Sequence, residues 1–348
     1  MPHSGKEKDE FMEKVVFASL GRKSGRVVVG PGRGLDNGVV AAWEGSVMLV
    51  TADPLSAIPA FGMRLSARMS VHLIASDFTA SGVDPEYAAF TYNFPPSMKR
   101  EQREAYVRAV GEECRLIGVA IVAGHTGSYP GGGYTVIGSG VMLGFAPEDG
   151  YVTPSMAREG DAVLVTKSAG MEAAATLALS FPQFLARRAG EGAVRRAAGM
   201  SRLCSTVTDS RAARTVGLGK GGVTSMHDAT EGGILGAISE MAHASGKAFV
   251  VDREKVPVSE EAGAVCGAFG LDPLKTMGEG SLVITCARER VSALKAALAR
   301  ARIKATDVGR VEQGAGLWLS GRGETRRSEP GRDRFWAAYD RAARLGLK

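Results

Sequence analysis

The chain has 348 residues, 45% of them apolar and 23% charged, which is typical of a soluble globular protein with one large or two ordinary domains. Its net charge is +6, but residues 321–348 hold eight Lys and Arg against four Asp and Glu, a local net of +4. The remainder is nearly neutral, which argues against a nucleic-acid partner and leaves a small anionic ligand such as a nucleotide.

Other features of the sequence restrict its location and chemistry. The N-terminal residues are polar and charged, unlike a signal peptide, and no apolar run reaches about 18 residues. We therefore expect a cytoplasmic protein with no membrane partner. The four cysteines are widely separated and form no C-x-x-C pair, which argues against zinc and redox motifs and favours buried thiols.

The first half of the chain predicts a sheet with two helices. β-branched and apolar runs indicate strands, and apolar residues recurring every four positions indicate a helix. In chain order we expect strands at Val39–Trp43 and Ser46–Thr51 joined by a turn at Glu44–Gly45, a helix over 59–76, a strand at Tyr87–Phe94, a helix over Pro96–Gly118, a buried strand at Val119–Ala123, a glycine-rich loop over 123–134 and a strand at Thr135–Phe145.

A turn-rich stretch at 146–161 predicts a domain boundary. Strands and helices mix on both sides of it, which favours two α+β or α/β domains over one doubly wound sheet. We assign 1–150 and 151–325 to these domains and 326–348 to a basic C-terminal helix. The elements expected in the second half are strands at Ala162–Thr166, Ser225–Met226, Ala248–Asp252, Ser281–Cys286 and Gly316–Leu319, and helices over Glu172–Leu185, Val194–Cys204, the residues after Glu231, and Arg290–Arg302.

Two adjacent glycines stand at the start of the amphipathic helix in this second half. One interpretation is a simple cap, with Asp228 as N-cap and Glu231 completing a capping box. It leaves Gly232 and Gly233 unexplained, because each costs about 0.8–1 kcal/mol in a helix relative to alanine. The favoured interpretation is a helix N-terminus that binds phosphate through bare N–H groups, with Mg²⁺ between the phosphate and the carboxylates of Asp228 and Glu231.

Acidic and polar residues also lie at the ends of elements in the first half. Carboxylates in such places are either turn residues or metal ligands. With glycine-rich loops before Asp36 and at Gly124, the set formed by Asp36, Asn37, Asp53 and Asp77 predicts a site for metal ions and phosphate.

Two histidines are candidates for proton transfer. His125 follows a predicted strand, where ligands commonly bind, although a surface-loop histidine explains it equally well. His227 has the stronger case because it adjoins Asp228.

In their order and spacing these motifs resemble the superfamily of aminoimidazole-ribonucleotide (AIR) synthase, thiamine-monophosphate kinase, selenophosphate synthetase and the hydrogenase-maturation protein HypE. The similar stretch covers roughly residues 25–320, and its Asp228–Gly233 motif is most similar to the HypE branch. The matching segments are Leu35–Val40, Val50–Asp53, Ser76–Pro85, Ala123–Thr126, Asp228–Gly233 and Glu279–Leu282.

The resemblance implies a PurM-like fold in a homodimer. The N-terminal sheets of two copies would form a shared barrel, the C-terminal half would be an α/β sandwich, and ATP with Mg²⁺ would bind near the dimer interface. On this basis we expect metal ligands at Asp36, Asp53, Asp77 and Asp228, nucleotide or substrate contacts at Asp36, Asn37, Asp53, Asp77, Gly124, His125, Thr126, Thr230, Gly232 and Gly233, and catalytic roles for His227, Asp228 and Glu231.

The chain also departs from the family's pattern. Asn37 and His125 stand where the family has acidic residues, which predicts weakened or lost Mg²⁺ sites, and Glu231 replaces an arginine of the HypE branch. The sequence ends at Lys348 without the terminal cysteine of HypE, and residues 1–30 hold no cysteine. We therefore expect no reaction on a cysteine in either terminal segment.

The sequence thus predicts an ATP- and Mg²⁺-dependent enzyme that activates or phosphorylates a small molecule or a side chain of a partner protein. A phosphotransferase like thiamine-monophosphate kinase and a catalytically impaired nucleotide-binding module remain the alternatives. In the basic C-terminal segment, Phe335, Trp336 and Tyr339 share one helical face, and we expect that helix to dock on its own domain rather than on a partner.

Overall fold

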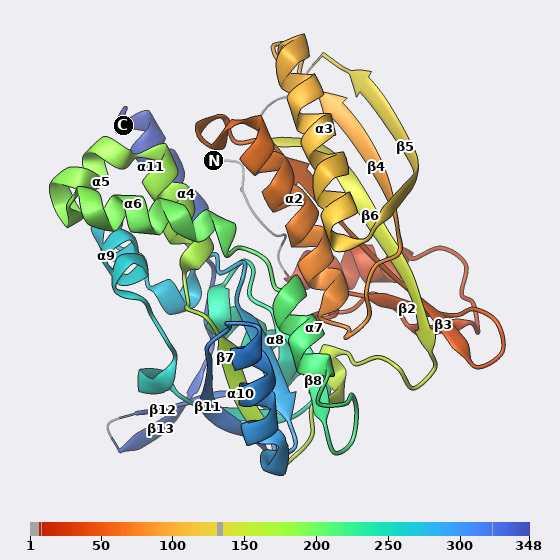
Figure 1. Cartoon of the computed structure of the whole chain (residues 1–348). Helices are drawn as coiled ribbons and strands as arrows, with labels where there is room; N and C mark the ends of the chain where they lie inside the picture. Colours follow the sequence, from red (N-terminus) through yellow and green to blue (C-terminus); the bar gives the residue numbers. More distant parts are fainter. Residues whose placement is uncertain (1–6, 8, 131–134, 322) are drawn as a thin grey trace.

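The structure, a computed structural model, describes residue 7 and the ranges 9–130, 135–321 and 323–348. It contains two mixed sheets, one built before residue 150 and one after residue 160 (Figure 1). A group of helices packs beside the second sheet.

The N-terminal sheet has the strand order β1-β2-β3-β6-β4-β5. All neighbours are antiparallel except β4 and β5, which run parallel. Its strands are Val27–Val29 (β1), Gly38–Ala41 (β2), Ser46–Ser56 (β3), Tyr87–Phe94 (β4), Ala120–Ser128 (β5) and Val136–Pro147 (β6).

Two helices, α2 (Gly62–Thr79) and α3 (Arg100–Ile117), cover one face of this sheet (Figure 1). Side chains alternate along a strand, so every second residue points at the helices. Leu49, Phe78, Phe90 and Met142 are fully buried between sheet and helices and form the centre of the first core. The alternate positions of the same strands face away from the helices.

The C-terminal sheet has the order β13-β12-β9-β11-β7-β10-β8. One face packs against α8 (Gly233–Ser245), and the other packs against α7 (Val207–Arg214) and α10 (Val291–Arg300), which makes a sandwich. The strands are Ala162–Thr166 (β7), Val223–Asp228 (β8), Ala248–Asp252 (β9), Leu282–Cys286 (β10), Ala305–Glu312 (β11), Gly316–Gly321 (β12) and Glu324–Ser328 (β13).

A third core lies among helices at the end of the C-terminal half (Figure 1). The helix expected over Glu172–Leu185 is broken at Pro182, because proline lacks the N–H that a continuing helix needs. The C-terminal helix docks on this group, as the sequence predicted. The members are α4 (Met171–Ser180), α5 (Pro182–Ala189), α6 (Glu191–Gly199), α9 (Glu260–Ala268) and α11 (Phe335–Arg344).

Of the other expectations about strands, helices and cysteines, some are confirmed and some are wrong. The strand expected at Val119–Ala123 is neither short nor buried: β5 extends to Ser128 through the predicted glycine-rich loop, and nearly all of its residues are exposed. Residues 131–134 of that loop lie outside the described residues. Strands β1, β11 and β13 and helices α7 and α9 were not expected. All four cysteines are buried and free, as predicted.

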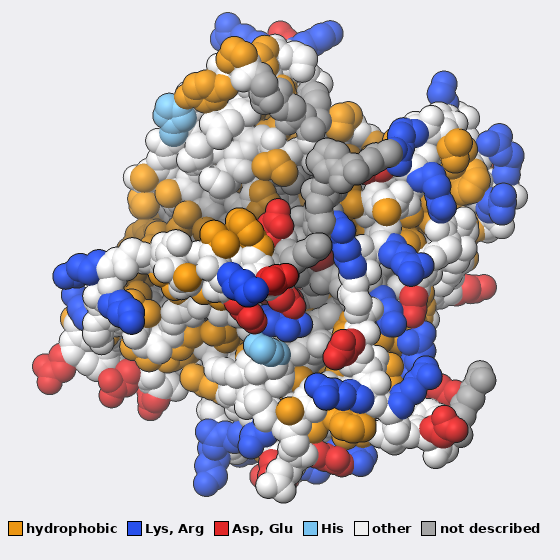
Figure 2. Space-filling view, turned by 180° about the vertical axis from the view of Figure 1, so that it is seen from behind, with side chains coloured by type: hydrophobic (Ala, Val, Ile, Leu, Met, Phe, Trp, Pro, Cys, Tyr) orange, Lys and Arg blue, Asp and Glu red, His pale blue; other side chains and the backbone are white. Residues whose placement is uncertain are grey.

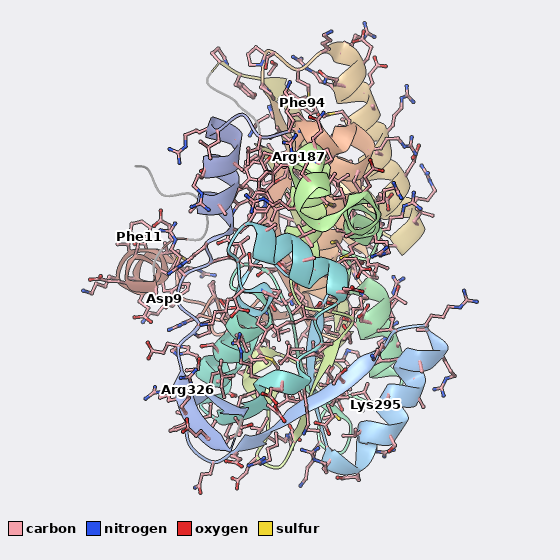
Figure 3. The ribbon with its side chains drawn as sticks, turned by 90° about the vertical axis from the view of Figure 1, so that its left-hand side faces the viewer. Asp9, Phe11, Phe94, Arg187, Lys295 and Arg326 are labelled. Carbon is pink, nitrogen blue, oxygen red and sulfur yellow. The ribbon has the colours of Figure 1, made fainter. Side chains whose placement is uncertain are left out.

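The described N-terminal residues form short helical turns that begin at α1 (Asp9–Phe11) and stand at the margin of the molecule (Figure 3). Phe11 is 47% exposed there. Within the described ranges, no helix is long and apolar enough to cross a membrane.

Polar contacts fix the two halves to each other. Arg211 and Arg214 of α7 bind the carboxylate of Asp84, at 2.7 and 2.6 Å. The backbone N–H of Thr206 donates to the hydroxyl of Ser76, at 3.0 Å. These contacts determine where α2 ends relative to the C-terminal sheet.

We expect Phe90→Ala to lower the stability of the protein by about 3–5 kcal/mol, because it opens a cavity between the sheet and its helices. Urea unfolding followed by circular dichroism measures the loss. The matched control is Phe11→Ala, which removes an exposed ring and should stay within about 0.5 kcal/mol of the parent. Equal effects of the two substitutions would contradict the core described above.

Candidate active site

Acidic residues from both halves of the chain meet between the two sheets. Asp36 precedes β2, Asp53 lies within β3 and Asp77 lies in the last turn of α2. From the other half come His227 and Asp228, the last two residues of β8. One ligand atom each from Asp36, His227 and Asp228 lies within 4.8 Å of the others.

His227 is buried at the centre of this cluster. Its Nδ1 lies 3.1 Å from Asp36 Oδ2 and 3.6 Å from Asp228 Oδ1, and its Nε2 lies 3.1 Å from Glu240 Oε2. Burial alone would lower the pKa of His227, but the surrounding carboxylates outweigh burial and raise that pKa well above its ordinary value. The imidazole is therefore held as a cation among carboxylates.

The carboxyl groups around His227 are destabilised in their charged form by burial and by one another. Burial raises the pKa of Asp36, and the charges of Asp228 and Glu240 add to the increase, while His227 opposes it. Burial, then Asp228 and then Asp53 raise the pKa of Asp77 well above its ordinary value. Too many negative groups share too small a volume for all of them to be ionised without a cation.

Two further glutamates extend the cluster and were not predicted as site residues. Glu279 lies just before β10, whose first residue, Leu282, pairs with Asp228. Burial, Asp228 and Glu172 raise the pKa of Glu279 well above its ordinary value. Glu172, in the first turn of α4, accepts a hydrogen bond from the backbone N–H of Glu279 at 3.2 Å, and burial raises its pKa to about 8.

The chemistry of this donor set fits a divalent cation. Within the described part of the chain, both carboxylate oxygens of Asp228 and of Glu279 are buried and accept no hydrogen bond of good geometry, and Oδ2 of Asp36 has only the imidazole of His227 beside it. Buried polar atoms in folded proteins nearly always have partners, so such oxygens indicate a missing ligand. Carboxylate oxygens are the ligands that Mg²⁺ prefers.

Asn37 is buried next to this cluster, where its side chain makes a hydrogen bond to the backbone. Its side-chain amide donates to the backbone carbonyl of Asp77 at 2.8 Å. The hydroxyl of Thr51 donates to the carbonyl of Asp36 at 2.9 Å. These two bonds join the Asp36 segment to β3 and to the end of α2, so they hold three of the predicted metal ligands in place.

The Asp228–Gly233 segment differs from both interpretations of the sequence. Asp228 is no N-cap, because it ends β8, and the cap of α8 is Gly232 at a φ of +86°. Gly233 has a φ of +62°, and a Cβ there would meet the carbonyl oxygen of Thr276 at 2.7 Å. The glycines are thus required by a left-handed turn and by close packing of the chain on itself.

An internal carboxylate occupies the start of α8, where phosphate was expected. The N–H of Gly232 donates to Oδ2 of Asp333 at 3.0 Å. Thr230 accepts hydrogen bonds through its carbonyl from the N–H groups of Gly233 and Gly278. Glu231 accepts one from the indole N–H of Trp336 at 3.2 Å.

Gly124, His125 and Thr126 are not brought to the acidic cluster by their own sheet. They lie on β5, the edge strand, and β4 and β6 separate it from β3. His125 contacts the hydroxyl of Tyr129 at 2.6 Å, and both side chains are at the surface. The prediction of a loop that follows a buried strand and joins the site is therefore wrong for one copy of the chain.

A groove of about 760 Å³ runs along α8 beside the cluster. Its walls come from α8, from Arg33 near the N-terminus and from the C-terminal segment up to Asp333, and Glu231 and Glu240 are among the residues that line it. Figure 2 shows acidic and basic side chains together with a histidine in the middle of the face that it displays. The groove offers charges of both signs to a ligand.

Comparisons with known proteins agree with this architecture. Residues 34–146 match the family described as AIR synthase related protein, N-terminal domain, and residues 158–320 match its C-terminal domain. The chain is 29% identical to the protein named carbamoyl dehydratase HypE of Rhizobium leguminosarum bv. viciae over 266 residues, 73% of this chain and 70% of that protein. The chain belongs to the AIR synthase-related family.

Solved structures share the fold. A ThiL protein complexed with AMPPCP and TMP superposes with a TM-score of 0.70 at 20% identity, over 92% of this chain and 97% of that one. A HypE in complex with ATP superposes with a TM-score of 0.67 at 21% identity, over 94% and 95%.

The metal-free protein should lose stability as the pH rises from about 5 to 8. A group whose pKa is raised by folding stabilises the folded protein fully at a pH below its unfolded pKa. That contribution is lost as the pH rises through its folded pKa. For Glu172 the pKa rises from 4.5 to about 8 on folding. Each unit corresponds to about 1.4 kcal/mol, so Glu172→Gln should lessen the loss by at least roughly 1 kcal/mol. Urea unfolding in chelator at several pH values measures it, and parallel curves for parent and variant would contradict the burial of this charge.

Proposed function

We propose that the protein is an enzyme that uses ATP and Mg²⁺ to activate an oxygen of a small molecule, or of a partner protein's side chain, by phosphorylation. The observation that carries the proposal is the set of buried carboxylates from both halves of the chain, in which Asp228 and Glu279 accept no hydrogen bond of good geometry and Asp36 faces only His227. Such a set is unfavourable by itself and becomes favourable around cations that also bind phosphate.

Asp36, Asp53, Asp77 and Asp228 would hold the metal, with Glu279 beside them. Bound Mg²⁺ would supply positive charge that lets carboxylates and phosphates share one site and that draws electron density from the transferred phosphoryl group. The protein's contribution is to hold these carboxylates in fixed places, so that no rearrangement is needed during the reaction.

His227 is our candidate for proton transfer. Its two nitrogens face carboxylates on opposite sides, which fixes the orientation of the ring and favours the imidazolium. A cation in this place can hold a proton for the oxygen that loses its bond to phosphorus, or can balance the charge of that oxygen. Glu231, which lines the groove, would act on the substrate side.

The relatives support a nucleotide-dependent reaction but differ in chemistry. One is named a carbamoyl dehydratase, a HypE was solved with ATP, and a ThiL protein was solved with AMPPCP and TMP. Incubating the pure protein with ATP and thiamine monophosphate separates the two classes. A diphosphate product would indicate a kinase that transfers phosphate to thiamine monophosphate, and would argue against activation of an acceptor oxygen.

Asp53→Asn and Asp228→Asn should each weaken Mg²⁺-dependent ATP binding by roughly 10-fold or more, since each removes a charged metal ligand. Isothermal titration calorimetry with and without Mg²⁺ measures the effect. Asp340→Asn, an exposed aspartate on α11, is the control and should bind as the parent does. If both site variants bind like the parent, the metal site is wrong.

We also propose that two copies associate through the exposed face of the N-terminal sheet. The side chains of β3 and β6 that point away from α2 and α3 are apolar and only half-buried, and they pair across the strands, Met48 with Phe145 and Val50 with Leu143. An apolar sheet face of this kind is a typical interface. In a dimer, β5 of the partner could bring Gly124, His125 and Thr126 to the site that they do not reach in one chain.

Leu143→Arg should convert the dimer to a monomer, because it places a charge at the centre of this face, beside Val50 and Tyr87. Light scattering after size exclusion should give twice the 36.4 kDa chain mass for the parent and the single mass for the variant. The control is Leu116→Arg, since Leu116 is already 76% exposed on α3. A parent that is monomeric at micromolar concentration would refute the interface.

A further inference from the structure

We infer that the C-terminal segment Asp333–Trp336 is a positioning element of the site, which fixes the Thr230–Gly233 turn and orients Glu231 in the wall of the groove. The inference rests on the proposed function, because it assigns Glu231 a task in that reaction. It concerns residues about 100 positions apart in the chain.

The first contact is made by Asp333. Its carboxylate accepts hydrogen bonds from the N–H of Gly232 at 3.0 Å, the hydroxyl of Thr276 at 3.1 Å and the N–H of Phe335 at 2.8 Å. One side chain thus joins the start of α8, the segment before β10 and the start of α11. A negative charge at the start of α8 is also favoured by the helix dipole.

The second contact is made by Trp336, whose indole N–H donates to Glu231 Oε1 at 3.2 Å. Glu231 follows Asp228 by three residues, and Asp333 is a negative neighbour. The hydrogen bond from the indole N–H limits the rotamers of Glu231. Both contacts therefore end on adjacent residues of one turn.

The segment is anchored independently of the turn that it holds. Phe335 is fully buried and lies against Trp336, with ring centroids 5.2 Å apart. The hydroxyl of Tyr339 contacts that of Ser180 at 3.3 Å, and the carbonyl of Lys348 accepts a hydrogen bond from α5 at 2.6 Å. Helix α11 lies alongside α4 and α5 in Figure 1, so the helical group holds the segment rigidly.

The turn needs such an anchor because of its composition. Two consecutive glycines have more accessible backbone conformations than any other pair, and both adopt left-handed φ values here. The bonds from Asp333 and Trp336 therefore restrict a turn whose glycines alone would leave it free to move. A displacement of about 1 Å of a reacting group can cost on the order of 100-fold in rate.

The test is a double-mutant cycle between Trp336→Phe and Glu231→Ala. Trp336→Phe keeps an aromatic ring against Phe335 but removes the indole N–H. We expect kcat for Mg²⁺-ATP-dependent phosphate release to fall about 10-fold, with KM for ATP changed less than about twofold. In the Glu231→Ala background the same substitution should have no further effect. Trp318→Phe, which loses an indole bond to the carbonyl of Ala315, is the control and should resemble the parent.

Two outcomes would overturn the inference: a Trp336→Phe enzyme with the kcat of the parent, or an equal loss with and without Glu231. A parent that releases no phosphate refutes the proposed function instead. The inference is then decided by hydrogen exchange of residues 229–236. Asp333→Ala should accelerate exchange there about 10-fold and Asp340→Ala should not, and unchanged exchange in Asp333→Ala refutes it.

Discussion

The mutual repulsion of buried carboxylates dominates this structure. Asp36, Asp77, Asp228 and Glu279 come from distant parts of the chain into a volume that cannot hold four free charges. Without a bound cation the protein can relieve the conflict in two ways, by keeping protons on the acids and by placing His227 among them. Burial raises the pKa of Asp36, Asp77 and Glu279, and His227 lies 3.1 Å from Asp36, which is the pattern expected of the metal site proposed above.

Rigid placement of the two halves makes this arrangement possible. The ion pairs of Asp84 with Arg211 and Arg214 fix α7 against the N-terminal half. Gly34 allows the loop before Asp36 to approach Glu240 so closely that a Cβ would lie 2.7 Å from a carbonyl oxygen. If the halves separated by even a few ångströms, the cluster would gain water and its carboxylates would no longer share one small volume.

Much of the fold and part of the site could be predicted from the sequence. The sequence predicts four of the site residues, because carboxylates at the ends of helices and strands, close to glycine-rich loops, are typical of metal and phosphate sites. They are Asp36, Asp53, Asp77 and Asp228. Glu279 begins a segment that resembles the family, Glu279–Leu282, but its place in the site was not predicted, because it depends on the pairing of β10 with β8, strands about 50 residues apart. The glycines at the start of α8 correctly indicated an unusual backbone, but their partner is Asp333, which a local reading cannot find. The extent of β5 was missed because glycine, a turn former, is tolerated on an exposed edge strand.

The raised pKa values of the buried acids have a consequence for any divalent ion that the proposed site would take up. A divalent ion can bind these carboxyl groups only as their protons leave, so the binding of one ion releases several protons. Affinity for the ion should then climb steeply between mildly acidic and neutral conditions. On the proposed function, acidification alone would release such an ion without any change in the amount of metal or nucleotide.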